Sequence, residues 1–195
     1  TEDLAGLVTD VNEWTSRAAL KVLRTRGASP ERWEVAAQLR SRFQREKGGP
    51  AALRILWALQ ALGTVTPDWL LARTGDDDEY VRSWAVRLLA EHFRMGGGVT
   101  DLGPEVAAKV LDRFEKMARA EASAHVRLHL ASVLQRLSVD ARAQVARALV
   151  GRGEDAADPA IPWLLWYGIE PLASLAPERF AGVAEASRIP MVRRF

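Results

Sequence analysis

His125 and His129 are the two side chains of this chain whose spacing could bind a metal ion. Residues four apart lie on the same face of a helix, so both imidazoles could approach one ion. A zinc site needs further protein ligands, and no glutamate stands between the two histidines and no cysteine occurs in the 195 residues. We therefore expect both histidines to be ordinary helix residues, and we predict no metal site.

A run of four acidic residues, Asp76 to Glu79, is a second candidate for binding a cation. It lacks the fixed aspartate and glycine spacing of a calcium-binding loop. Carboxylates that precede a helix can accept hydrogen bonds from its first N–H groups and face the positive end of its dipole. The run therefore predicts a turn that caps the next helix.

Arginines recur at one position of an internal repeat, where they could bind phosphates. Arg54, Arg82 and Arg127 each follow an apolar residue in aligned segments, and Arg193 takes the same place near the end of the chain. Such a ladder could neutralise the phosphates of a nucleic acid. The alternative is that each arginine pairs with an acidic residue of a neighbouring turn, and this structural role is the one we expect.

The seven tryptophans are a large number for a chain of this length. Tryptophan and arginine are enriched where binding energy is concentrated, but tryptophan also packs in cores with its indole N–H bonded to a carbonyl. We expect core packing for Trp57 and Trp84, whereas both interpretations stay open for Trp14 and Trp163. The candidate interaction face comprises Trp14, Arg54, Arg82, Arg127, Trp163 and Arg193.

No arrangement of residues typical of an active site stands out. The sequence contains no Ser/His/Asp set, no phosphate-binding glycine loop and no evident pair of catalytic carboxylates. The absence of cysteine removes thiolate metal sites, cysteine nucleophiles and a C-x-x-C-H haem attachment. We predict no catalytic residue and no cofactor in this segment.

A repeated phrase predicts the elements that position these residues. Residues 78–89 read Asp-Glu-Tyr-Val-Arg-Ser-Trp-Ala-Val-Arg-Leu-Leu, and residues 123–134 and 12–23 are similar. Alternating strand patterns are scarce, while Ala, Leu, Arg and Glu favour helix, and glycine and proline separate the segments. The predicted helices cover residues 12–26, 30–46, 50–62, 67–74, 78–95, 103–120, 123–137, 139–150, 159–173 and 177–186.

Repeats of two helices, with Val-Arg on the second helix, resemble HEAT repeats. We name the first helix of each pair A and the second B. The helix predicted for residues 12–26 is the first B helix, residues 30–46 and 50–62 form the next A and B pair, and residues 177–186 form the last A helix. The repetition predicts an all-α fold, a right-handed α-solenoid of about five HEAT-like helix pairs, because repeated units bury their cores against their neighbours. Residues 1–195 are expected to form a single domain. Aligned apolar positions of the B helices predict a continuous core of Leu56, Ala85, Leu88, Leu89, Leu130, Val133, Leu134 and Leu165.

The last residues of the chain resemble the start of another B helix. Met191-Val192-Arg193-Arg194 repeats the phrase, and the chain stops at Phe195. We therefore expect the domain to be truncated within a further repeat. Without the rest of that helix, Ile189, Met191, Val192 and Phe195 are expected to be poorly packed or to mediate crystal or dimer contacts.

Composition excludes few classes of function. The 27 basic and 25 acidic residues give a net charge of +2, a weak electrostatic footprint for a nucleic-acid-binding protein. No apolar run approaches the roughly 20 residues that span a bilayer, so we expect no membrane insertion by this segment. The sequence itself does not indicate a compartment.

Residues 155–172, 187–195 and 10–27 carry a resemblance to a known family. They include Asp158-Pro159-Ala160-Ile161-Pro162-Trp163, and they resemble the helical middle region of large multidomain proteins of planctomycetes and related bacteria. Those proteins look like membrane-bound dehydrogenases, with a β-propeller, HEAT repeats and a c-type cytochrome domain. Val11 and Thr15 depart from the family, which tends to show Pro-Asn and a tryptophan pair there.

The resemblance implies a non-catalytic HEAT-repeat scaffold that joins a β-propeller to a c-type cytochrome domain. Its partners would be neighbouring domains of the same polypeptide or another protein, its setting extracytoplasmic, and haem c would belong to the parent chain. The alternative is a HEAT-like nucleic-acid-binding module of the alkylpurine DNA glycosylase class, which needs a basic concave face and a catalytic carboxylate. An ordinary enzyme is the third hypothesis.

Overall fold

A computed structural model describes residues 2–26, 29–46, 48–95 and 100–194 as an all-helical chain. No strand occurs among these residues, and their one β-type contact is an isolated antiparallel bridge between Phe93 and Thr100. The chain divides into two compact units, residues 1–82 and 83–195, each of which is described by itself.

The described residues of the first unit form five helices and the first turn of a sixth. They are α1 (Glu2–Leu7), α2 (Glu13–Thr25), α3 (Arg32–Phe43), α4 (Gly49–Ala61), α5 (Pro67–Arg73) and the start of α6 (Glu79–Glu91).

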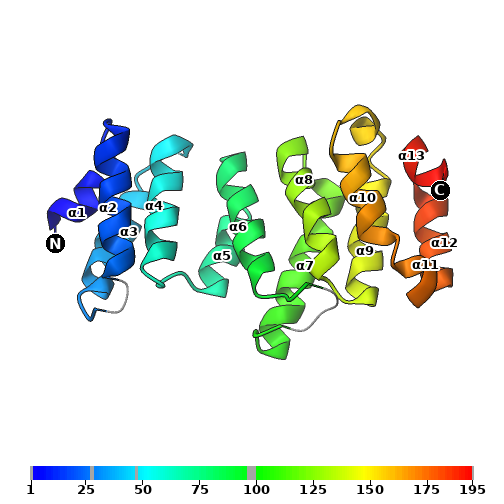
Figure 1. Cartoon of the computed structure of the whole chain (residues 1–195), viewed down its shortest axis with the longest axis horizontal. Coiled ribbons are helices and arrows are strands. Elements are labelled where there is room, and N and C mark those ends of the chain that lie inside the picture. Colours follow the sequence, from blue (N-terminus) through cyan, green and yellow to red (C-terminus); the bar gives the residue numbers. More distant parts are fainter. Residues whose placement is uncertain (1, 27–28, 47, 96–99, 195) are drawn as a thin grey trace. The chain divides into compact units, whose positions relative to one another are not determined.

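The second unit contains the rest of α6 and the helices that follow it in chain order (Figure 1). These are α7 (Pro104–Ala120), α8 (Ala124–Val133), α9 (Val139–Val150), α10 (Ile161–Ile169), α11 (Leu172–Leu175), α12 (Pro177–Ala186) and α13 (Pro190–Arg194), with 3₁₀ turns η1 (Leu134–Arg136) and η2 (Gly153–Ala157).

Side-chain caps explain where several helices begin. The Asn12 side chain accepts a hydrogen bond from the backbone N–H of Trp14, and Ser123 caps α8 and Ser138 caps α9 in the same manner. Such caps satisfy N–H groups that have no partner within the helix. The sequence therefore determines these helix starts locally, before any tertiary contact is considered.

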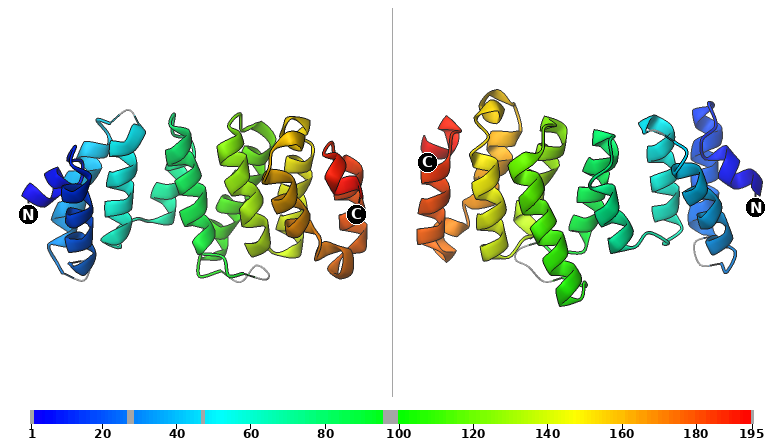
Figure 2. Two further views of the ribbon diagram at one scale, coloured as in Figure 1. Left: turned by 45° about the horizontal axis from the view of Figure 1, so that its top comes forward. Right: turned by 180° about the vertical axis from the view of Figure 1, so that it is seen from behind.

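Within each unit, A helices pack on A helices and B helices pack on B helices. In residues 1–82, α1 packs on α3 and α2 packs on α4. In residues 83–195, α7, α9 and α12 contact one another in succession, as do α8, α10 and α13. Figure 2 shows α7 to α13 from two further sides, again succeeding one another in chain order. This A-on-A and B-on-B packing is a helical-repeat architecture within each unit.

The apolar residues predicted for the core are buried. Leu56 lies in the first unit, whereas the other seven lie in the second, and each is at most 5% exposed. The prediction of their burial is therefore confirmed within each unit.

Several predicted helices end earlier than expected, and two of them show why. The helix predicted for residues 78–95 is α6, which ends at Glu91, because Phe93 leaves it to pair with Thr100. The helix predicted for residues 159–173 is split into α10 and α11, because Pro171 has no N–H to continue the first of them. The short helices α1 and η2 were not predicted.

The expectation of a poorly packed C-terminal end is wrong for the residues that the structure describes. Ile189 and Val192 are buried, and Met191 is half-buried. The backbone N–H of Arg188 donates to the carbonyl of Val150 at 2.8 Å, and α13 packs on α10 and α12. A helix of five residues is thus long enough to cover these side chains; Phe195 lies outside the described residues.

Candidate functional site

The aligned arginines fasten the turns that precede their own helices. Arg82 Nη1 donates to the carbonyl oxygens of Asp76 and Asp77, six and five residues before it, at 2.9 and 3.0 Å. Arg127 Nη1 makes the same two bonds to Glu121 and Ala122, at 2.9 and 2.8 Å. This shared geometry explains why the repeat places an arginine one turn into these B helices.

Arg127 also reaches the next turn along the chain. Its Nε and Nη2 atoms lie 2.6 and 2.5 Å from the two carboxylate oxygens of Asp155 in η2. The side chains of this pair are only 4% and 3% exposed. Hydrogen bonding to Asp155 raises the pKa of Arg127 more than burial lowers it, so the guanidinium stays charged.

Arg54, in α4, instead contacts the turn that precedes α2. Its Nη1 donates to the carbonyl of Asp10 at 2.9 Å, and its Nη2 lies 3.5 Å from a carboxylate oxygen of Glu13. The expected pairing with an acidic residue of a neighbouring turn is thus present for Arg54 and Arg127.

Arg127 therefore does not belong to an exposed interaction face, because its charge is buried and paired. Arg54 and Arg82 are half-buried, and they bind backbone carbonyls of their own unit. Arg193, in α13, is the exposed member of the set. A ladder of free guanidinium groups is not formed by the arginines that the sequence aligned.

We expect duplex DNA to bind this chain more weakly than 1 μM at about 150 mM salt, because non-specific DNA binders have dissociation constants of about 10⁻⁴–10⁻⁶ M there. The physical reason is the small net charge of +2 together with the internal bonds of the arginines. Fluorescence anisotropy with a labelled duplex measures this. Sub-micromolar binding would instead support the nucleic-acid-binding module.

The acidic run forms the predicted cap. Asp78 Oδ1 accepts from the backbone N–H groups of Tyr80 and Val81 at 2.8 and 3.2 Å. Its Oδ2 accepts from the N–H of Gly49, at the start of α4, 29 residues earlier. Burial raises the pKa of Asp78, but these three N–H groups and Arg82 lower it more. The carboxylate therefore stays ionised at a lower pH than an ordinary aspartate does.

Replacing Asp78 with alanine should lower the free energy of unfolding by about 1–2 kcal/mol, the usual cost of a lost helix cap plus a weakened partner for Gly49. Urea unfolding measures the loss. Because its folded pKa is lowered, Asp78 contributes stability above its unfolded pKa and loses it as the pH falls through the folded pKa. Asp78→Asn should therefore make the free energy of unfolding fall less steeply as the pH is lowered. An unchanged pH dependence at acidic pH would contradict this role. Ser138→Ala, which removes the side-chain cap of α9, is the matched control.

Exposed aromatic side chains gather instead on the B helices. In the first unit, Leu53, Trp57 and Tyr80 line a groove of about 380 Å³, which we name the first aromatic patch. Glu13 lies on its rim, next to Trp14, which is 76% exposed. Trp14 and Tyr80 share one position of the repeat, two residues after the capping residue.

Trp163 and Tyr167 of α10 form the second aromatic patch, in the second unit. Their rings stack with centroids 6.2 Å apart, and the residues remain 47% and 58% exposed. Leu164, between them in sequence, lines a hollow of about 520 Å³ with Arg87 and His129. Tyr167 was not predicted, although its spacing of four residues from Trp163 places both rings on one helical face.

The tryptophans expected in the core are only partly buried. Trp57 lies in the first aromatic patch, and Trp84 is half-buried beneath the Arg87 guanidinium, 4.6 Å from the ring centroid. Both residues therefore lie at the edge of the core and not inside it. Trp14 and Trp163 are exposed and therefore do not pack in the core.

The histidine pair packs against itself. The rings of His125 and His129 meet edge to face with centroids 5.0 Å apart, and His125 Nε2 lies 3.1 Å from Ser83 Oγ. Burial lowers the pKa of His129, and His125 and Arg87 lower it further, so its ring is neutral near pH 7. Ser83 is fully buried, so its hydroxyl is inaccessible to a substrate.

Among the described residues, no group of three or more His, Cys, Asp or Glu side chains converges as metal ligands would. Within the same residues, no helix combines the length and the apolar character needed to cross a bilayer. Comparisons with protein-family models, with curated proteins and with solved structures gave no match to this chain.

Proposed function

We propose that the chain is a non-catalytic interaction module in which about five HEAT-like helix pairs stack as a right-handed α-solenoid. The packing of A helices on A helices and of B helices on B helices within each unit supports this arrangement. So does the arginine that fastens equivalent turns at Arg82 and Arg127. The shared geometry supports treating the helices that carry Arg82 and Arg127 as copies of one repeat.

The observation that carries the binding role is the second aromatic patch. Trp163 and Tyr167 hold a stacked, partly exposed pair on a helix whose other face is buried. A rigid aromatic pair loses little conformational entropy when a partner covers it, which is why such residues dominate binding energies at interfaces. We propose that this patch, with the first aromatic patch, contacts a protein partner.

The family resemblance suggests which partner. We propose that the module joins a β-propeller and a c-type cytochrome domain of a larger extracytoplasmic redox protein, in which haem c is bound by the neighbouring domain. In this arrangement the helical module contributes no reacting group. It holds the two domains at a fixed separation through its surface residues.

Binding to the c-type cytochrome domain of the same gene product tests the proposal by isothermal titration calorimetry. Trp163→Ala combined with Tyr167→Ala should weaken binding at least tenfold, which corresponds to about 1.4 kcal/mol. Trp33→Ala is the matched control, because Trp33 is 54% exposed on an A helix and should be neutral. Unchanged binding by the double variant would contradict the role of the patch. A gene without a C-x-x-C-H motif would contradict the proposed setting.

A further inference from the structure

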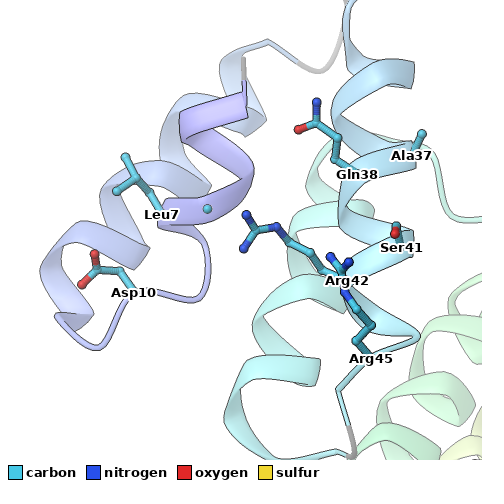
Figure 3. Close-up of a pocket in the computed structure, with 8 residues that line it drawn as sticks. Leu7, Asp10, Ala37, Gln38, Ser41, Arg42 and Arg45 are labelled. Atoms are coloured by element: carbon cyan, nitrogen blue, oxygen red, sulfur yellow. The ribbon is translucent and has the colours of Figure 1, made fainter.

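An open hollow of about 1060 Å³ lies between the end of α1 and the C-terminal half of α3, in residues 1–82 (Figure 3). Leu7 and Asp10 line it from the α1 side, and Gln38, Ser41, Arg42 and Arg45 line it from α3 and the turn that follows. It lies beside two A helices that pack on each other, and it shares no lining residue with either aromatic patch.

The hollow carries two arginines, Arg42 and Arg45. Arg42 extends from α3 toward α1, and its Nη2 lies 3.5 Å from the position that a Cβ would take on Gly6 (Figure 3). Neither Arg42 nor Arg45 forms an ion pair with a carboxylate among the side chains that the structure describes. Elsewhere in this unit, Arg17, Arg54 and Arg73 each have an acidic partner.

The one acidic side chain in the lining is held by its own turn. Asp10 Oδ1 accepts from the backbone N–H of Asn12 at 2.7 Å. Two guanidinium groups and one carboxylate leave the lining with a net positive charge. The Ser41 hydroxyl and the Gln38 amide add hydrogen-bond donors that carry no charge of their own.

We propose that this hollow binds a phosphate group. Guanidinium groups present pairs of N–H donors whose geometry matches phosphate oxygens, and two of them suit a dianion better than a single carboxylate. The group comes from free inorganic phosphate or from a phosphate monoester of a small molecule. This site is independent of the interaction role proposed for the B helices.

A purely structural role for the same arginines makes a different prediction. Arg42 and Arg45 lie at the C-terminal end of α3, where positive charge stabilises a helix through its dipole. If this were their whole function, neutralising them would lower the melting temperature without removing any saturable anion binding. The binding measurement therefore separates the two roles.

The test is an NMR titration of the full chain with inorganic phosphate, phenyl phosphate and benzoate. We expect saturable shifts of the Gly6 and Ser41 amides with a phosphate probe, and at least tenfold weaker binding by Arg42→Gln combined with Arg45→Gln. Arg42→Lys combined with Arg45→Lys keeps the charge but loses the paired donors, and should weaken binding several-fold. Arg24→Gln, an exposed arginine outside the hollow, should bind as the natural sequence does.

The two phosphate probes distinguish the source of the group. Tighter binding of phenyl phosphate assigns a monoester, and equal binding assigns free phosphate. Benzoate binding as tight as that of the phosphate probes would overturn the choice of a dianion. A dissociation constant above about 1 mM for both phosphate probes, which is a binding free energy weaker than about −4.1 kcal/mol, would overturn the site. If the double glutamine variant does not fold, Arg45→Gln alone decides, because Arg45 is exposed and its loss should still weaken binding.

Discussion

Replacing Asp155 with alanine is expected to lower the free energy of unfolding by about 3–5 kcal/mol, because it leaves the Arg127 guanidinium buried without its counter-charge. The two side chains are 4% and 3% exposed and share two hydrogen bonds of 2.5 and 2.6 Å. Urea unfolding followed by circular dichroism measures the change. A loss below about 1 kcal/mol, the range of an exposed pair, would show that the ion pair is not buried in solution.

An exposed ion pair of the same unit provides the control. Asp112 lies 2.7 Å from Lys116, and both side chains are more than half exposed. Asp112→Ala should change the free energy of unfolding by no more than about 0.5 kcal/mol. Replacing both partners, as Arg127→Met with Asp155→Leu, should cost less than Asp155→Ala alone, because no buried charge is then left unpaired.

Truncating Leu89 to alanine is expected to cost about 2–5 kcal/mol, through the lost burial of its methyl groups and the cavity that remains. Leu89 is fully buried in α6. Urea unfolding again gives the free energy. The same truncation at Leu175, which is 65% exposed, should change the free energy of unfolding by about 0.5 kcal/mol or less.

A loss below about half a kcal/mol for Leu89→Ala would place this side chain outside a packed core. Such a result would also remove the physical basis for aligning Leu89 with Leu134 across the repeat. Both leucines end their copies of the phrase, and both are fully buried.

Most helices could be predicted because their boundaries are determined locally. Residues 139–150 were predicted as one helix and form α9, with Ser138 as its cap. Helix α1 could not be predicted in the same way, because six residues show less than two turns of apolar periodicity. Its position depends on packing against α2 and α3, which is a tertiary effect.

The sequence indicated which residue types would matter at the candidate site, but it did not indicate which residues they contact. The repeat led us to expect a structural role for Arg127, but its partner Asp155 lies 28 residues away in a 3₁₀ turn that has no helical pattern. The hollow beside Arg42 depends on α1, so the sequence could not indicate it. Tyr167 could have been found, because it repeats the position of Trp163 one turn later.

The proposed solenoid requires that the helix pairs stack in one continuous array. Small-angle X-ray scattering on the chain in solution measures this directly. A compact globule of 195 residues has a radius of gyration of about 16 Å. Stacked pairs separated by about 10 Å should instead give about 20 Å, because helices pack at that spacing. We predict a value near 20 Å with the scattering curve of a rigid rod; a value near 16 Å, or the curve of two units that move independently, would contradict the solenoid.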